Sequence, residues 1–206
     1  MPQLILARHG NTFEKGQTPL YVGSQTDLPL TEKGHEQAEA IAQYLQRQEI
    51  IPTAIFSGNL QRQRQTAAHL ASTIHISDAL DEIDYGLWEG LSLAQIQATW
   101  PDAYTTWCQS AIWPTGIFPK NETFYQSRVK SWLEYLTQTF NSEDVIIGVT
   151  SNGLIRYVYS LLDSTWEEKV KEKRIEDLKV KTGHLCSLTL NLGGGAIVEW
   201  NVDPRV

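Results

Sequence analysis

Arg8, His9 and Gly10 are the residues whose types and spacing first suggest chemistry, because they directly follow an apolar run. An arginine can donate two parallel hydrogen bonds to a phosphate or carboxylate, and an imidazole can act as a nucleophile or base near neutral pH. The glycine lets the backbone turn closely past a bound group. An ordinary strand end is the alternative, so the triplet alone leaves a purely structural role open.

Short apolar runs predict strands that bring such residues to one edge of a sheet. Residues 3–7, 53–57 and 144–150 are typical of buried parallel strands. Ligands of open α/β sheets gather at the carboxyl ends of the strands. His9 follows the first of these runs and Ser151 follows the last. We therefore expect both loops at the same edge of the sheet.

The segments between these strands have the periodicity of amphipathic helices, and Asn59 is the expected N-cap of the second helix. The chain ends with an alternating run, three glycines and a second apolar run, a pattern that predicts a hairpin at the sheet edge. This order predicts an α/β fold of three layers, α/β/α, with a mostly parallel open sheet, helices on both faces and an edge hairpin at the C-terminus. The expected helices cover residues 31–45, 60–71, 121–140 and 154–162.

Length and charge restrict the class of protein. A chain of 206 residues without repeats or low-complexity linkers predicts one domain over residues 1–206. The net charge of −7 disfavours nucleic acid as a partner, and no apolar run approaches the length of a membrane span. Cys108 and Cys186 lack metal-ligand spacing, which favours a reduced, cytoplasmic protein.

Four ordered motifs together resemble the histidine phosphatase (phosphoglycerate mutase-like) superfamily. They keep the order and approximate spacing of that family, from the first strand to about Arg156 and more weakly beyond it. The motifs are Arg8-His9-Gly10, Asp27-Leu28-Pro29-Leu30-Thr31 with Gly34, Phe56-Ser57-Gly58-Asn59-Leu60-Gln61-Arg62 with Gln65-Thr66-Ala67, and Asp81-Glu82-Ile83-Asp84-Tyr85-Gly86-Leu87-Trp88-Glu89-Gly90.

The resemblance implies a role for each matched residue. His9 would be the nucleophile that forms a phosphohistidine, and Glu82 would be the acid that protonates the departing alkoxide. Arg8 and Arg62 would bind the phosphoryl oxygens; Arg64 would point away, because two residues along a helix are about 200° apart. Such a site implies a small phosphorylated substrate and neither a cofactor nor a metal ion.

The sequence departs from the family pattern after the predicted strand at 144–150. Ser151 stands where the family has a second catalytic histidine, and Asn152 stands where it has glycine. Asn11 replaces the usual Glu or Gln after Gly10. We expect Asn11, Ser151 and Asn152 near the phosphate, whereas His184 either lends an imidazole to the pocket or has a structural role.

These observations predict a phosphohydrolase acting on a small phosphate monoester, with activity reduced if Ser151 replaces a catalytic group. A phosphoglycerate mutase-type phosphoryl transfer is one alternative, and a non-catalytic phospholigand-binding protein is the other. An aromatic-rich cap segment at about 91–120 either lines the substrate site or simply packs as a helical excursion. The sequence leaves open whether the protein is a homodimer.

Overall fold

The computed structural model describes residues 1–206 and contains one six-stranded sheet in the order β3-β2-β4-β1-β5-β6. Strands β1 to β4 are parallel, whereas β5 pairs antiparallel with both β1 and β6. The α/β prediction, with its mostly parallel sheet and edge hairpin, is therefore confirmed. The strands are β1 (Gln3–Arg8), β2 (Ala54–Ser57), β3 (His75–Ile76), β4 (Val145–Thr150), β5 (Leu185–Asn191) and β6 (Gly194–Val202).

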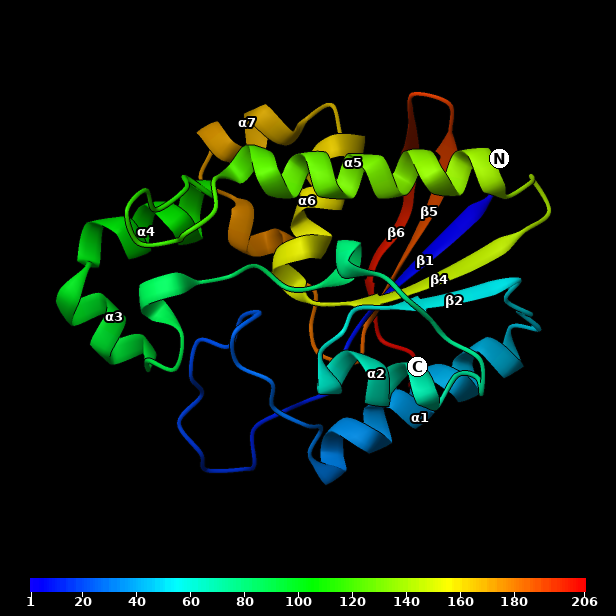
Figure 1. The fold of residues 1–206 in the computed structure, drawn as a ribbon, viewed down its shortest axis with the longest axis horizontal. Coiled ribbons are helices and arrows are strands. Elements are labelled where there is room, and N and C mark those ends of the chain that lie inside the picture. Colours follow the sequence, from blue (N-terminus) through cyan, green and yellow to red (C-terminus); the bar gives the residue numbers. More distant parts are fainter.

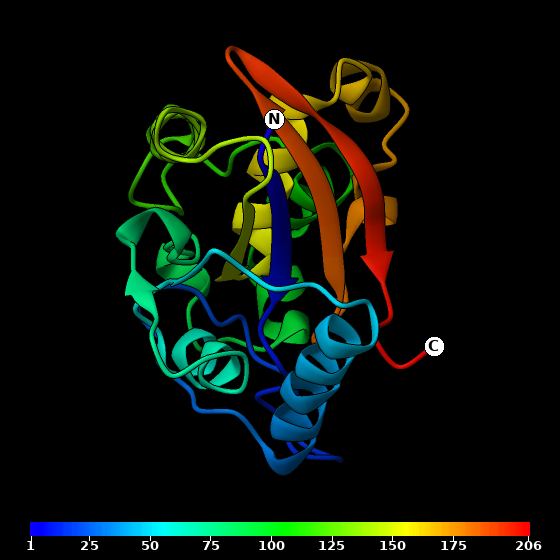
Figure 2. The same cartoon turned by 90° about the vertical axis from the view of Figure 1, so that its right-hand side faces the viewer.

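Helices cover both faces of the sheet, which gives the predicted three layers. Figure 1 shows α1 and α2 on one side of the strands and α5 with α6 on the other, and the same layers are visible from the side in Figure 2. The helices are α1 (Glu32–Arg47), α2 (Gln61–Ala68), α3 (Leu93–Thr99), α4 (Pro101–Ser110), α5 (Glu122–Thr139), α6 (Asn152–Leu162) and α7 (Trp166–Lys171), with 3₁₀ turns at Asp78–Leu80, Gly86–Trp88 and Ile175–Leu178.

The alternation of side chains along β1 divides the core between these two layers. Leu4 and Leu6 belong to the larger hydrophobic cluster, which includes residues of α5 and α6. Ile5 and Ala7 belong to the smaller cluster, which includes residues of α1 and α2. Because successive residues of a strand face opposite sides, a run that is apolar throughout is what a strand buried on both faces requires.

Local signals explain where the helices begin. The Thr31 hydroxyl accepts a hydrogen bond from the Gly34 N–H at 3.1 Å, which satisfies one free donor in the first turn of α1. The N-cap predicted for α2 was wrong, because Leu60 and not Asn59 has that position. The Asn59 amide instead donates to Asp78 at 2.7 Å and to Asp81 at 3.1 Å, and so ties α2 to the segment that carries Glu82.

The aromatic-rich segment forms α3, α4 and a loop that extends beyond one end of the sheet (Figure 1). Trp107 and Phe118 from this segment are buried, and the Phe118 ring packs edge to face against Trp88 at 5.0 Å and against Trp107 at 5.3 Å between ring centroids. This packing anchors the segment to the domain. None of the helices in the structure is long and apolar enough to cross a membrane.

Candidate active site

Strand β1 ends between β4 and β5, and this position fixes Arg8 and His9. The backbone N–H of His9 donates to Thr150 O and that of Arg8 donates to His184 O, both at 3.0 Å. The following Gly10 lies so close to α1 that an added Cβ would be 2.2 Å from Gly34 O, a distance that no side chain allows. Glycine is therefore required where the chain leaves the strand.

The His9 ring is buried and held in one orientation. Its Nδ1 lies 2.7 Å from Gly10 O, and because a carbonyl only accepts, Nδ1 carries the proton and Nε2 keeps its lone pair. Burial holds the pKa of His9 well below its ordinary value, and the positive charges of Arg62 and Arg8 lower that pKa further. The imidazole is therefore neutral at physiological pH, which is the form that can act as a nucleophile.

Arg8 is held by a segment far away in the sequence. Its Nη1 donates to Val180 O, and Val180 N in turn donates to the side-chain oxygen of Asn152 at 2.9 Å. The Nε of Arg8 is buried and has no acceptor within the protein. A guanidinium with a buried, unused donor is what an oxyanion site needs.

Arg62 enters the site from the first turn of α2 and is almost completely buried. Two backbone carbonyls of the long loop after β1 orient it: Nη1 donates to Thr26 O at 2.7 Å and Nη2 donates to Gly23 O at 3.0 Å. Glu89 holds this loop, because its carboxylate accepts from Gly23 N at 2.9 Å and from the Thr26 hydroxyl at 2.6 Å. The sequence did not reveal this indirect role of Glu89 in placing Arg62.

Glu82 is buried and meets the N-terminus of α6. Its carboxylate accepts from its neighbour Ile83 N at 2.9 Å and from Gly153 N at 3.3 Å. Burial lowers the pKa of Arg8 and of Arg62, and the charge of Glu82 opposes this in both. The structure therefore brings His9, two arginines and one carboxylate into a single electrostatic cluster.

Ser151 and Asn152 follow β4 at the same edge of the sheet, as the topology predicts. Ser151 is fully buried, and its hydroxyl oxygen accepts from the amide of Gln63 at 3.0 Å. The side-chain oxygen of Asn152 is engaged with Val180 N. No signal in the sequence singled out Gln63, because a glutamine in an apolar helix pattern has the appearance of a surface residue.

The other two candidates have contacts mainly with loops. The side-chain amide of Asn11 donates to the Thr31 hydroxyl at 3.1 Å and to Phe13 O, so it shapes the loop after β1. The ring of His184 lies against the chain end: Nδ1 is 3.0 Å from Asn201 O and Nε2 is 3.7 Å from a carboxylate oxygen of Asp203. Both ring nitrogens of His184 thus face groups outside the cluster around His9.

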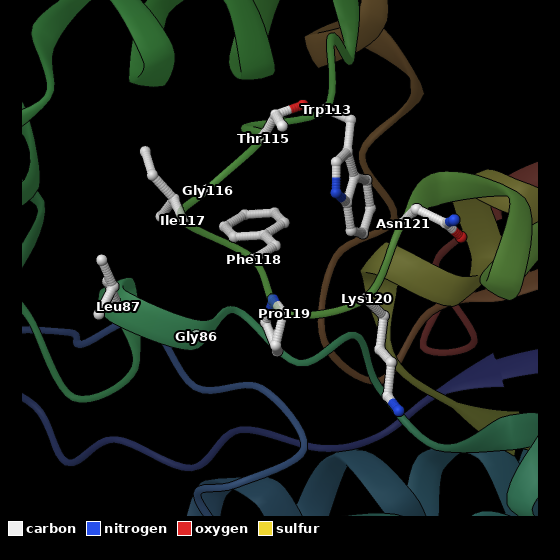
Figure 3. Close-up of a pocket in the computed structure, with 10 residues that line it drawn as sticks. All are labelled: Gly86, Leu87, Trp113, Thr115, Gly116, Ile117, Phe118, Pro119, Lys120 and Asn121. Carbon is white, nitrogen blue, oxygen red and sulfur yellow. The ribbon is translucent and has the colours of Figure 1, made fainter.

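A pocket of about 570 Å³ lies between the aromatic-rich segment and the turn at Gly86–Trp88, and none of the residues of the cluster lines it (Figure 3). The rings of Trp113 and Phe118 lie side by side in its wall, with centroids 5.0 Å apart (Figure 3). The lining residues are Gly86, Leu87, Trp113, Thr115, Gly116, Ile117, Phe118, Pro119, Lys120 and Asn121.

The chain and its fold have counterparts among known proteins. A model of the histidine phosphatase superfamily (branch 1) matches residues 4–203, so the chain belongs to this superfamily. The predicted resemblance is confirmed at this level. The mycobacterial glucosyl-3-phosphoglycerate phosphatase in complex with VO3 has the same fold, with a TM-score of 0.78, 24% identity and coverage of 97% of this chain and 98% of that one.

Two curated relatives have different activities. Phosphoserine phosphatase 1 of Hydrogenobacter thermophilus is 29% identical over 79% of this chain and 76% of its own length. The 2,3-bisphosphoglycerate-dependent phosphoglycerate mutase of Mesorhizobium japonicum is 28% identical over 98% of this chain and 94% of its own. The superfamily thus contains both phosphatases and mutases among the proteins similar to this one.

Proposed function

We propose that the protein is a phosphohydrolase that acts on a small phosphate monoester through a phosphohistidine at His9. The Nε2 lone pair of His9 attacks phosphorus, an N–P bond forms and the ester O–P bond breaks. Glu82 gives its proton to the leaving oxygen. In the second step the Glu82 carboxylate takes a proton from water, the water oxygen attacks phosphorus, and the N–P bond breaks to release inorganic phosphate.

The observation that carries this proposal is the buried, neutral His9 that is subject to the charges of Arg62 and Arg8. The charges that lower the pKa of His9 are the ones that would bind the phosphoryl oxygens, so the same two groups keep the nucleophile unprotonated and attract its substrate. The unused donor of Arg8 supports an anion as the ligand. Positioning and charge complementarity account for most of the catalysis in phosphoryl transfer, so the proposal requires no cofactor or metal ion.

Ser151 is proposed to replace the second histidine of the superfamily. It follows β4 and occupies the N-cap position of α6 without a side-chain hydrogen bond to the helix, and its hydroxyl proton has no acceptor among the side-chain contacts in the protein. We assign that proton to a phosphoryl oxygen, with Asn11 and the amide nitrogen of Asn152 at the border of the same site. Loss of a preorganised donor typically costs about 10² to 10³ in rate, so a serine donor in place of an imidazole predicts a slower enzyme, not an inactive one.

Mutase-type transfer is the second candidate, because the relative from Mesorhizobium japonicum matches 98% of the chain. The two activities differ in the acceptor of the phosphoryl group, which is water for the phosphatase and a second hydroxyl for the mutase. A non-catalytic binding protein is less favoured, since such a protein needs neither an oriented nucleophile nor an adjacent acid. The homodimer and the cytoplasmic location stay predictions from the sequence.

A panel of esters tests the proposal. Wild-type protein is incubated with phosphoserine, 3-phosphoglycerate and an aryl phosphate, and both inorganic phosphate and isomerised ester are measured. We expect release of inorganic phosphate by wild-type protein and none above background by His9→Ala. Isomerisation without phosphate release would favour the mutase, and binding of the esters without turnover would favour the non-catalytic protein.

A further inference from the structure

Gln63 is a fully buried polar side chain that joins three separate segments around the site. Its oxygen accepts from Leu60 N at 3.3 Å, at the start of α2. Its nitrogen donates to Leu80 O at 2.9 Å and to the Ser151 hydroxyl at 3.0 Å. Both N–H groups of the Gln63 amide therefore donate a hydrogen bond, and its oxygen accepts one. These three contacts fix the orientation of the amide.

The residues around Gln63 accommodate its side-chain amide. An added Cβ at Gly58 would lie 2.1 Å from the oxygen of Gln63, so the glycine after β2 makes room for the amide. Leu80 O receives a second hydrogen bond, from the Thr150 hydroxyl at 2.6 Å. Leu80 therefore keeps a partner without Gln63, whereas Ser151 has no other donor to its oxygen among the side-chain contacts.

The contact with Gln63 determines what the Ser151 hydroxyl can do. A hydroxyl that accepts a hydrogen bond from an amide directs its own proton away from that amide and becomes a stronger donor. Ser151 lies at the N-terminus of α6, where Glu82 also binds. The hydroxyl proton of Ser151 is therefore directed away from Gln63 and is free to donate to a bound group.

We propose that Gln63 is a positioning residue that orients the Ser151 hydroxyl toward the phosphoryl group. It never touches substrate, and it acts through Ser151. In this proposal, the two side chains together provide one oriented hydrogen-bond donor at the end of β4. This inference rests on the proposed function, since it assumes that a phosphoryl group is bound beside Ser151.

A double-mutant cycle tests this. Phosphoryl transfer to water is measured as kcat/KM with an aryl phosphate for wild type, Gln63→Met, Ser151→Ala and the double variant. Gln63→Met keeps the volume and removes the donors; we expect about a tenfold loss with Ser151 present, the usual scale of one hydrogen bond, and at most about a twofold loss in Ser151→Ala. An equal loss in both backgrounds would overturn the inference.

Gln37 provides a matched control on α1. It is also buried, and it too accepts from a backbone N–H, that of Asn11 at 2.8 Å, and donates twice, to Thr182 O at 3.0 Å and to the Thr182 hydroxyl at 3.2 Å. Gln37→Met should therefore disturb folding to a similar degree but change kcat/KM by the same factor with and without Ser151. Coupling of Gln37 to Ser151 as strong as that of Gln63 would contradict a specific role.

The pH dependence of kcat/KM distinguishes a positioning role from a purely packing role of Gln63. This test uses Gln63→Glu, which keeps a polar side chain at the position. In Gln63→Glu the introduced carboxyl can donate to Ser151 only when protonated. We expect kcat/KM of this variant, relative to wild type, to recover as the pH falls, and Gln63→Met to show no recovery. Parallel profiles of the two variants would overturn the inference.

Failure of the proposed function has a different signature. If wild-type protein forms no phosphohistidine, the proposed function is wrong. The double-mutant cycle is then repeated with the affinity for inorganic phosphate as the measured quantity. Non-additive losses of phosphate affinity for Gln63→Met and Ser151→Ala would still support the positioning role. Additive losses would reject it.

Discussion

The protonation state of His9 depends on burial and on two neighbouring arginines. Because its pKa is held well below the ordinary value, the unfolded chain binds a proton at His9 in a pH range where the folded chain does not. The contribution of His9 to stability is therefore fully present above about pH 6.5, and it is lost as the pH falls toward the lowered pKa. The nucleophile stays available in mildly acidic solution for the same reason.

Removal of one of these charges should raise the pKa of His9. In Arg62→Met the largest Coulombic contribution to the lowered pKa disappears, so we expect the titration of His9 to move upward toward about 6.5. The shift is measurable from the ring proton signals of the five histidines, with His9 assigned by comparison with His9→Ala. Arg64→Met is the control, because Arg64 is exposed on the same helix. An unchanged titration in Arg62→Met would contradict the electrostatic account.

The proposed role of Glu82 as general acid predicts an effect that depends on the leaving group. Glu82→Gln removes the proton donor, and general acids contribute about 10² to 10⁴ in rate when the leaving oxygen is a poor one. We expect a loss in this range for alkyl phosphates and a much smaller loss for aryl phosphates, whose phenolate departs without a proton. The comparison requires kcat/KM for both ester classes. Equal losses would exclude a general-acid role.

At the scale of elements, the N-terminus of α6 determines where the Glu82 carboxylate lies. Gly153 N donates to this carboxylate, and an added Cβ at Gly153 would lie 2.4 Å from Glu82 Oε1 and 2.9 Å from the Tyr85 hydroxyl. The glycine permits a close approach of helix and carboxylate that no other residue allows. The residues after β4 therefore position the proposed acid, in addition to their proposed contact with the phosphoryl group.

Gly153→Ala should displace Glu82. Overpacking of this kind typically costs about 1 to 3 kcal/mol, and here the displaced group is the proposed acid. We expect a lower melting temperature and, in addition, a loss of kcat/KM that is larger for alkyl than for aryl phosphates. Gly194→Ala on β6 is the control, since the nearest atom to an added Cβ there is 3.9 Å away. Wild-type activity on alkyl phosphates in Gly153→Ala would be inconsistent with the contact.

At the scale of the whole molecule, His184 connects the edge hairpin to the end of the chain. Its ring contacts Asn201 and Asp203, and its backbone carbonyl accepts from Arg8 N. The side chain thus belongs to the packing of the C-terminal residues, while its backbone supports the strand that carries the nucleophile. This arrangement favours a structural role over a catalytic one.

His184→Gln should therefore affect stability more than turnover. The lost contacts are each worth about 1 kcal/mol, so we expect a lower melting temperature and kcat/KM within about threefold of wild type at a temperature where both proteins are folded. His75→Gln on the exposed β3 is the control for stability. A loss of about a hundredfold in kcat/KM with an unchanged melting temperature would instead place His184 in the site.

The sequence predicted the layers for physical reasons that apply locally, whereas the residues of the cluster were predicted from the resemblance to the superfamily. An uninterrupted apolar run identifies β1, and helical periodicity identifies α1. Contacts that span the chain were beyond such reasoning: Gln63 meets Ser151 across 88 positions, and Arg8 meets Val180 across 172. Hydrophobic periodicity does not identify these side chains. A polar residue that is fixed by tertiary contacts cannot be distinguished by sequence from a polar residue exposed to water.

A phosphoryl group on His9 during turnover can be detected by a rapid alkaline quench followed by peptide mapping. Wild-type protein, His9→Ala and the control His75→Ala are mixed with an aryl phosphate and denatured during turnover. We expect one phosphoryl group on the peptide that contains His9 in wild type and His75→Ala, and none in His9→Ala. Steady turnover by His9→Ala at the wild-type rate, or a phosphoryl group on any other residue, would contradict the proposed role of His9.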